Sequence, residues 1–242
     1  MLAVREIDPQ VYRGLVRNGG LVCSRVRLKQ SDLLISACRD LSREAMPLVV
    51  HYRGQIEDYI AVNPFFLRSM VPVETDEGAP EIVRVMIDAG AKAGVGPMAA
   101  VAGALAEFVG RGLMESSPEI IVENGGDIFF HASSRKEVLL LAESSPLKGL
   151  RIAVGPTSSP IGICTSSGIL GHSISFGNAH AVMIVAASAS LADAAATSVA
   201  NIVKGVSDIE RGLDRAREIG TDGAVILASD RVGAWGRIEI VG

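Results

Sequence analysis

The chain is poor in aromatic residues and in cysteine. Its 242 residues include six Phe, three Tyr and one Trp. The three cysteines, Cys23, Cys38 and Cys164, are odd in number and form no C-x-x-C pair, which argues against a disulfide framework and against a zinc knuckle. We therefore expect a chain that works in a reducing compartment, the cytoplasm.

Several familiar signatures are also missing. The patterns G-x-x-x-x-G-K-[ST], G-x-G-x-x-G and G-x-S-x-G do not occur, which argues against a P-loop, a dinucleotide fingerprint and a serine hydrolase elbow. The first residues carry charge at Arg5, Glu6 and Asp8, so no secretory signal is expected. A net charge of −4 disfavours binding to nucleic acid through its phosphates.

One apolar segment, residues 181–203, is long enough to be tested as a membrane span. Asp193 lies near its middle and would cost about 2.5–3.5 kcal/mol there. The sequence predicts instead a strand over 181–185 and a helix over 191–204, with no membrane partner.

Small residues replace the missing aromatics, with 26 Gly and 30 Ala in the chain. Such residues let backbones approach one another and leave room for a ligand. They concentrate in segments 89–106, 155–177 and 186–200, which makes these segments the first place to look for a site.

The order of the predicted elements suggests an internal duplication. Shifting the chain by 97 residues superimposes 85–87 on 182–184. In both regions the sequence predicts a strand, then a turn of small residues, then a helix. We predict one domain over 1–242, with pseudo-repeat cores near 82–130 and 179–230 as one interpretation and two unrelated units of similar composition as the other. The predicted elements are strands at 82–87, 119–123, 181–185 and 224–228, and helices at 97–109, 191–204 and 208–219.

The region before these units is predicted to hold a helix over 31–45, with Ser31 as its cap. A hairpin is predicted next, with strands 48–52 and 55–62 on either side of Arg53-Gly54.

The first candidate site is Asn124-Gly125-Gly126-Asp127. Two glycines expose bare backbone against which a flat or phosphorylated ligand can lie, and Asn124 and Asp127 offer hydrogen bonds. The alternative is that Asn-Gly and Gly-Gly simply form a hairpin turn between two apolar strands.

The second candidate pairs Asp193 with Thr197. Four residues apart, they share one face of a helix, and a carboxylate and a hydroxyl are hard oxygen ligands suited to Mg²⁺. The alternative is structural, because Ser190 and Asp193 form an S-x-x-D pattern typical of a helix start.

Two further candidates are weaker. Thr165, Ser166, Ser167 and Gly168 combine hydroxyls with glycine and are followed by His172, a candidate acid or base. In a separate segment, the backbone amides around Gly94 and Gly96 precede a predicted helix and so form a candidate anion site.

Taken together, these residues resemble the ApbE-like family, the FAD:protein FMN transferases, in a shorter branch without a lipoprotein signal. Residues 123–128 resemble the family segment N-x-G-G-D-I, and 165–168 resemble its T-S-G loop with one inserted Ser. The segment 191–197 resembles its L-A-D-A-x-A-T helix, whose Asp and Thr bind the metal.

This resemblance implies an α+β fold of duplicated T-fold-like strand and helix units with largely antiparallel sheets. Strand and helix order alone would also allow a parallel α/β sheet. The resemblance implies FAD and Mg²⁺ as cofactors, with Asp193 and Thr197 as metal ligands and His172 and Asp193 as catalytic residues. The nucleotide would be held by Gly94, Gly96, Asn124, Gly125, Gly126, Asp127, Thr165, Ser166, Ser167 and Gly168.

Departures from the family leave two functions open. The family pattern H-x-x-D-P-x-T-G is reduced to His172-Ser-Ile-Ser-Phe-Gly, which loses the Asp and the Pro. One function is a flavin-nucleotide-binding, Mg²⁺-dependent FMN transferase or FAD-cleaving enzyme with an acceptor protein. The other is a non-catalytic small-molecule or nucleotide-binding protein with the same fold, and the oligomeric state is open in both cases.

Overall fold

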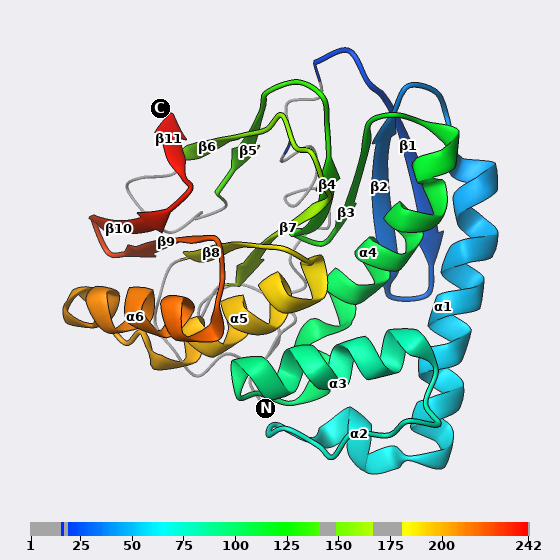
Figure 1. Cartoon of the computed structure of the whole chain (residues 1–242), viewed down its shortest axis with the longest axis horizontal. Helices are drawn as coiled ribbons and strands as arrows, with labels where there is room; N and C mark the ends of the chain where they lie inside the picture. Colours follow the sequence, from blue (N-terminus) through cyan, green and yellow to red (C-terminus); the bar gives the residue numbers. More distant parts are fainter. Residues whose placement is uncertain (1–15, 17–18, 141–148, 167–180, 242) are drawn as a thin grey trace, which may run out of the picture.

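The computed structural model describes residues 16, 19–140, 149–166 and 181–241, and these residues form three layers (Figure 1). Helices cover one face of a large central sheet, and a small sheet covers part of its other face. Alternate residues of the central strands therefore enter two separate apolar cores, as the two-residue period of a strand requires.

The central sheet has eight strands in the order β1-β2-β3-β4-β7-β8-β9-β10, and every neighbouring pair is antiparallel. This confirms the predicted α+β class and excludes the parallel alternative. The strands are Val22–Leu28 (β1), Ser31–Ala37 (β2), Ile120–Asn124 (β3), Asp127–His131 (β4), Ile161–Ser166 (β7), Ala181–Ala186 (β8), Gly223–Ala228 (β9) and Arg231–Gly236 (β10).

The helices supply the second layer. Helix α4 packs on β3 and β4, α5 on β7 and β8, and α6 on β9, while α4 and α5 also contact each other. The helices are Ser42–Val62 (α1), Pro64–Arg68 (α2), Glu81–Ala93 (α3), Val101–Leu113 (α4), Ala189–Ile202 (α5) and Ile209–Ile219 (α6), and a 3₁₀ turn over Pro97–Ala100 leads into α4.

The small sheet has the order β11-β6-β5, with strands Glu239–Val241 (β11), Arg151–Val154 (β6) and Lys136–Leu139 (β5). Val138 and Ile152 from this sheet enter a core with residues from the central strands, such as Phe130 and Leu227. Phe129, the neighbour of Phe130, instead faces the helices.

The sequence predicted the second half of the chain well. The predicted strands at 119–123, 181–185 and 224–228 are β3, β8 and β9, and the helices at 191–204 and 208–219 are α5 and α6, each within a few residues. The helix predicted over 97–109 also forms, with its first turn in the tighter 3₁₀ geometry.

The predicted strand over 82–87 is wrong, because these residues lie in α3. Ile82, Val83, Met86 and Ile87 are all buried, and their spacing follows one helical face. The 97-residue shift therefore places a helix on the strand β8, so that alignment fails. The division into cores near 82–130 and 179–230 stays a prediction.

The predictions for residues 31–62 are also wrong. The helix over 31–45 is instead β2 followed by the start of α1, and the hairpin around Arg53-Gly54 lies inside α1. Arg53 forms an i,i+4 ion pair with Glu57 and donates a hydrogen bond to Ser31 on β2. Helical side-chain pairs and the packing of α1 outweigh the turn preference of one glycine.

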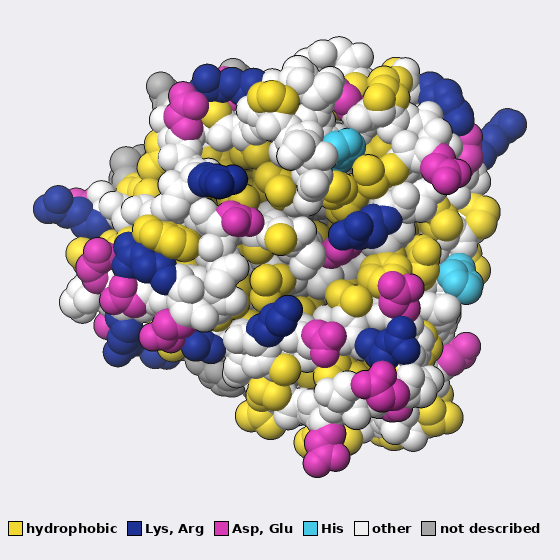
Figure 2. All heavy atoms as spheres, viewed as in Figure 1, with side chains coloured by type: hydrophobic (Ala, Val, Ile, Leu, Met, Phe, Trp, Pro, Cys, Tyr) yellow, Lys and Arg dark blue, Asp and Glu magenta, His cyan; other side chains and the backbone are white. Residues whose placement is uncertain are grey.

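Basic and acidic side chains are interspersed on the face that the helices form (Figure 2). Among the described residues, no single helix is long and apolar enough to cross a membrane, and α3 with the segment Pro97–Ser116 meets the length and composition requirement only as a pair bent by 105°.

A buried ion pair joins the central sheet to the small sheet. Glu119 precedes β3, Lys136 begins β5, and their side chains are 10% and 3% exposed, with 3.1 Å between Nζ and Oε2. Glu119 also accepts hydrogen bonds from the amide and hydroxyl of Ser133. Burial by itself raises the pKa of Glu119, but these donors together with Lys136 lower it to about 2.

We predict that Glu119→Gln destabilises the protein by about 3–5 kcal/mol at pH 7, because Lys136 then keeps a buried charge with a hydrogen bond to Ser134 but without the opposite charge of Glu119. The folded pKa lies below the unfolded value of about 4.3, so this stabilisation is complete above pH 4.3 and is lost as the pH falls toward 2. Urea unfolding at pH 7, 5 and 3 measures both effects. The exposed pair Arg135–Glu239 gives the control, and Glu239→Gln should change stability by less than about 1 kcal/mol.

Two glycines allow α5 to start deep inside the structure. A Cβ on Gly103 of α4 would lie 2.2 Å from the carbonyl oxygen of Ala189, and a Cβ on Gly162 of β7 would lie 2.3 Å from the Cα of Ala189. The first residue of α5 is therefore held between a helix and a strand at distances that no side chain permits. Gly103 also lies against Asp193, since its Cβ would come within 2.8 Å of the Cβ of Asp193.

We predict that Gly103→Ala and Gly162→Ala each destabilise the fold by more than about 2 kcal/mol, since backbone would have to move to admit a methyl group. Gly54 inside α1 is the matched control, because a Cβ there meets nothing within 4 Å. Gly54→Ala should stabilise the protein by about 0.5–1 kcal/mol. Thermal unfolding of the three variants tests these predictions. A Gly103→Ala variant as stable as wild type would contradict the close approach of α4 and α5.

Candidate functional site

The candidate site lies where the first turn of α4 meets α5 and the β3–β4 turn. Asp193 of α5 accepts a hydrogen bond from the amide of Gly103 through Oδ2 at 2.9 Å, and the amide of Ala102 is a second donor. Asn124 donates through Nδ2 to the carbonyl oxygen of Ala102 at 3.1 Å. The first amides of a helix have no partner within the helix, so Asp193 acts as a cap supplied from another element.

The segment Asn124–Asp127 is a hairpin turn, as the alternative interpretation predicted. Asn124 pairs with Asp127, and Gly125 and Gly126 between them have φ angles of 66° and 112°. Only glycine adopts two such angles in succession at low cost. The turn is also part of the site, since Asn124 contacts α4 and Asp127 lies opposite Cys164 on β7.

Asp127, Cys164 and Asp193 influence one another electrostatically. Burial raises the pKa of Asp127 to about 7, although the thiol of Cys164 and the amide of Thr165 oppose the rise. Burial and the charge of Asp127 raise the pKa of Asp193 well above its ordinary value, against the amides of Gly103 and Ala102. The pKa of Cys164 is raised in the same way, so its thiol stays protonated and is no nucleophile.

Other predicted residues lie around this cluster or outside the described residues. Ser166 is buried at the end of β7, and its Oγ has no hydrogen-bond partner among the described residues. Thr165 is half-buried beside it, and Thr197 is buried one turn after Asp193 on α5. Ser167, Gly168 and His172 lie outside the described residues.

The amide of Gly94 is not free, contrary to the prediction. Gly94 ends α3 with a φ angle of 69°. Its amide donates to the carbonyl oxygen of Ala91, and the amide of Val95 donates to the carbonyl oxygen of Gly90. Gly96 is buried against the backbone of Ser69, where a Cβ would lie 1.8 Å from the carbonyl oxygen. Both glycines therefore have structural reasons to be there, and their part in holding a nucleotide stays a prediction.

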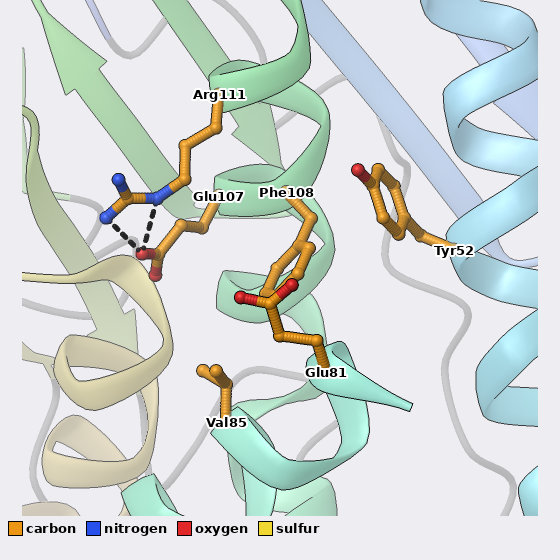
Figure 3. Close-up of a pocket in the computed structure, with 6 residues that line it drawn as sticks. All are labelled: Tyr52, Glu81, Val85, Glu107, Phe108 and Arg111. Carbon is orange, nitrogen blue, oxygen red and sulfur yellow. Dashed lines mark hydrogen bonds and ion pairs between the residues drawn. The ribbon is translucent and has the colours of Figure 1, made fainter. Parts of the chain in front are cut away.

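A separate pocket of about 310 Å³ opens between α1, α3 and α4 (Figure 3). None of its lining residues is among the predicted site residues. Figure 3 shows the carboxylate of Glu81 near the middle of the labelled residues, whereas the carboxylate of Glu107 turns toward Arg111, with which it is paired. The lining residues are Tyr52, Glu81, Val85, Glu107, Phe108 and Arg111.

The residues around Asp193 suit a divalent cation in their chemistry. Carboxylate and hydroxyl oxygens are hard ligands that suit Mg²⁺, and Asp193 and Thr197 supply one of each. A cation also relieves the cost of placing the carboxylates of Asp127 and Asp193 near each other. Within the described part of the chain, no three His, Cys, Asp or Glu side chains come together as a metal cluster, so the remaining ligands would be water or substrate oxygens.

The sequence missed three of the residues that build this site. Ala102 and Gly103 contact residues that follow 22 and 90 positions later, and Glu107 contacts Ser190 across 83 positions. Runs of alanine and glycine carry no local signal for such contacts. The S-x-x-D pattern was misplaced by two residues, since Ser188 caps α5 by accepting from the amide of Leu191.

The fold is similar to those of solved flavin transferases. The apo form of the flavinyl transferase ApbE from Pseudomonas stutzeri matches with a TM-score of 0.61 at 13% identity, over 89% of this chain and 93% of that one. The flavin transferase ApbE from Vibrio cholerae matches with a TM-score of 0.52 at 12% identity, over 88% and 96% of the two chains. At these identities the likeness defines the class of fold, an ApbE-like fold.

Sequence comparison gives the family. The family described as AbpE bacteria matches residues 13–229. UPF0280 protein MJ1526 of Methanocaldococcus jannaschii is 39% identical over 222 residues, which are 88% of this chain and 90% of the relative. UPF0280 protein MK0206 of Methanopyrus kandleri is 41% identical over the same length and shares. The chain therefore belongs to the ApbE-like family, as its motifs predicted.

We predict that Asp127→Asn raises the thermal stability of the protein at pH 8. The folded pKa of about 7 lies above the unfolded value of about 3.9, so the ionised wild-type carboxyl lowers stability progressively as the pH rises between these values. Asn still accepts a hydrogen bond from the amide of Thr165 and carries no charge. A gain of a few degrees is expected, because about 1 kcal/mol corresponds to about 2–4 °C at this size.

The difference between Asp127→Asn and wild type should disappear near pH 4, where both side chains are neutral. Thermal melts at pH 4, 6 and 8 in metal-free buffer test this. A variant that is less stable than wild type at pH 8 would show that Asp127 is stabilised by partners stronger than its burial.

Proposed function

We propose that this protein binds a flavin nucleotide, FAD, together with Mg²⁺, and acts as an FMN transferase or FAD-cleaving enzyme. The carrying observation is that the first turn of α4 contacts both Asp193 and Asn124 of the β3–β4 turn, on an ApbE-like fold. The family membership and the names of the structural neighbours, both flavin transferases, support the flavin as ligand.

In this proposal Asp193 and Thr197 hold the cation. Mg²⁺ would stabilise the charge that develops on a pyrophosphate as AMP leaves. Asp193 is held by the first amides of α4, so its carboxylate keeps one orientation before any ligand arrives.

The nucleotide itself would lie against backbone and small polar groups. The glycines of the β3–β4 turn leave backbone bare. The Oγ of Ser166, which has no hydrogen-bond partner in the described ranges, offers a buried hydrogen-bonding group. Further contacts are proposed for Asn124, Asp127, Thr165, Ser167 and Gly168, and His172 is proposed as acid or base.

An acceptor protein with a Ser or Thr hydroxyl completes the transferase reaction. Within the described part of the chain, Cys23 and Cys38 are exposed and form no disulfide, which suits the reducing cytoplasm that the proposal assumes. A second candidate, a nucleotide-binding protein without transfer activity, is favoured by the missing Asp-Pro after His172.

We predict that the purified protein releases AMP from FAD in the presence of Mg²⁺. Asp193→Asn, which keeps an acceptor for the amides of α4 but loses the charge, should lower the rate at least about 100-fold, because a catalytic metal is worth several kcal/mol. Asp214→Asn on the exposed side of α6 is the control and should keep the wild-type rate.

AMP is measured by chromatography and bound flavin by fluorescence. If FAD binds but no AMP is released, even when an acceptor peptide that contains Thr is added, the enzyme proposal is wrong and the non-catalytic candidate remains. If FAD does not bind, both candidates are wrong.

A further inference from the structure

Glu107 links α4 to the start of α5. Its Oε2 accepts hydrogen bonds from the amide of Ser190 at 3.2 Å and from the Ser190 hydroxyl at 2.7 Å. Its Oε1 accepts from Nε and Nη2 of Arg111 at 3.0 and 2.8 Å, as the dashed lines in Figure 3 show. The Glu107 side chain is only 6% exposed, whereas that of Arg111 is 52% exposed.

The two helices therefore cap each other. Glu107 of α4 accepts from an amide in the first turn of α5, and Asp193 of α5 accepts from amides in the first turn of α4. Each carboxylate lies near the positive end of the other helix dipole, which favours its negative charge. Ser190 and Asp193 are three residues apart on one helix, so a contact that holds Ser190 also holds Asp193.

We propose that Glu107 is a positioning residue that fixes the carboxylate of Asp193 for the divalent cation, acting through Ser190. This rests on the proposed function, since it assumes that Asp193 binds the cation. Arg111 takes one oxygen of Glu107 and leaves the other for Ser190, so the carboxylate has one orientation. Removing the contact leaves the amides of Ala102 and Gly103 as the remaining hydrogen-bond donors from α4 to Asp193, so the carboxylate is less firmly held.

The other acid of the same pocket provides the comparison. Glu81 also lines the pocket, but it lies on α3 and is exposed. A change at Glu81 alters the charge of the pocket by the same amount as a change at Glu107 and leaves the contact with Ser190 in place.

The test measures Mn²⁺ affinity of the full chain without any nucleotide, by electron paramagnetic resonance of free Mn²⁺. Glu107→Leu, which replaces the carboxylate with an apolar side chain and so removes both acceptor oxygens, should weaken Mn²⁺ binding about tenfold, as loss of a group that orients a metal ligand does. Ser190→Ala should weaken it in the same direction by a smaller factor. Glu81→Leu should leave the Mn²⁺ affinity unchanged.

The double variant Glu107→Leu/Ser190→Ala should bind Mn²⁺ no more weakly than Glu107→Leu alone, because both changes remove one contact. Thermal unfolding identifies the variants that fold. If Glu107→Leu does not fold, Ser190→Ala carries the test, and wild-type Mn²⁺ affinity in that variant overturns the proposal.

Asp193→Asn separates this proposal from the proposed function. If Asp193→Asn abolishes Mn²⁺ binding while folded Glu107→Leu binds as wild type does, Glu107 has no positioning role and the metal site stands. If Asp193→Asn binds Mn²⁺ as wild type does, the metal site itself is wrong, and the role of Glu107 falls with it.

Discussion

The mutual capping of α4 and α5 is the contact on which the rest of the site depends. Two helices begin side by side in the interior, where their first amides are remote from water and each unpaired amide is costly. Asp193 and Glu107 satisfy those amides across the helix pair, and the glycines at 103 and 162 bring the backbones close enough for them to reach. Bulky side chains at these two positions would hold the elements apart.

This arrangement carries an electrostatic cost that a ligand can offset. Asp127 and Asp193 are partly buried, and the charge of Asp127 acts on Asp193. Burial raises the pKa of both carboxyl groups, and the charge of Asp127 raises that of Asp193 further, so their ionised forms lower the stability of the folded state. A cation, or the protonation of one carboxyl, lowers this cost. Groups held at a cost to the folded state are typical of binding sites, whereas the pair Glu119–Lys136 at the opposite sheet interface is balanced internally.

Local sequence patterns were sufficient to predict the type of an element where its residues show a single clear pattern of burial. The strands β3, β8 and β9 are continuous apolar runs, and α6 has a strongly one-sided distribution of charge, so their types follow from the sequence. The same rules failed for β2, α1 and α3. A β-branched run in α3 and an Arg-Gly pair in α1 favour strand and turn locally, but burial of one helical face and the contact of Arg53 with Glu57 and Ser31 outweigh those preferences.

By itself the sequence determined the antiparallel α+β class, through its resemblance to a family. It also pointed to the residues of the candidate site: Asp193, Thr197, Asn124 and the glycines of the β3–β4 turn. Only the tertiary structure decided that Ala102 and Gly103 meet Asp193 and that Glu107 holds Ser190, because these partners are 83–91 residues apart. A hydrogen bond across that separation leaves no periodic trace in the sequence. These hydrogen bonds form because the buried first amides of α4 and α5 need an acceptor. The packing of α4 on α5 brings the carboxylates of Asp193 and Glu107 to those amides.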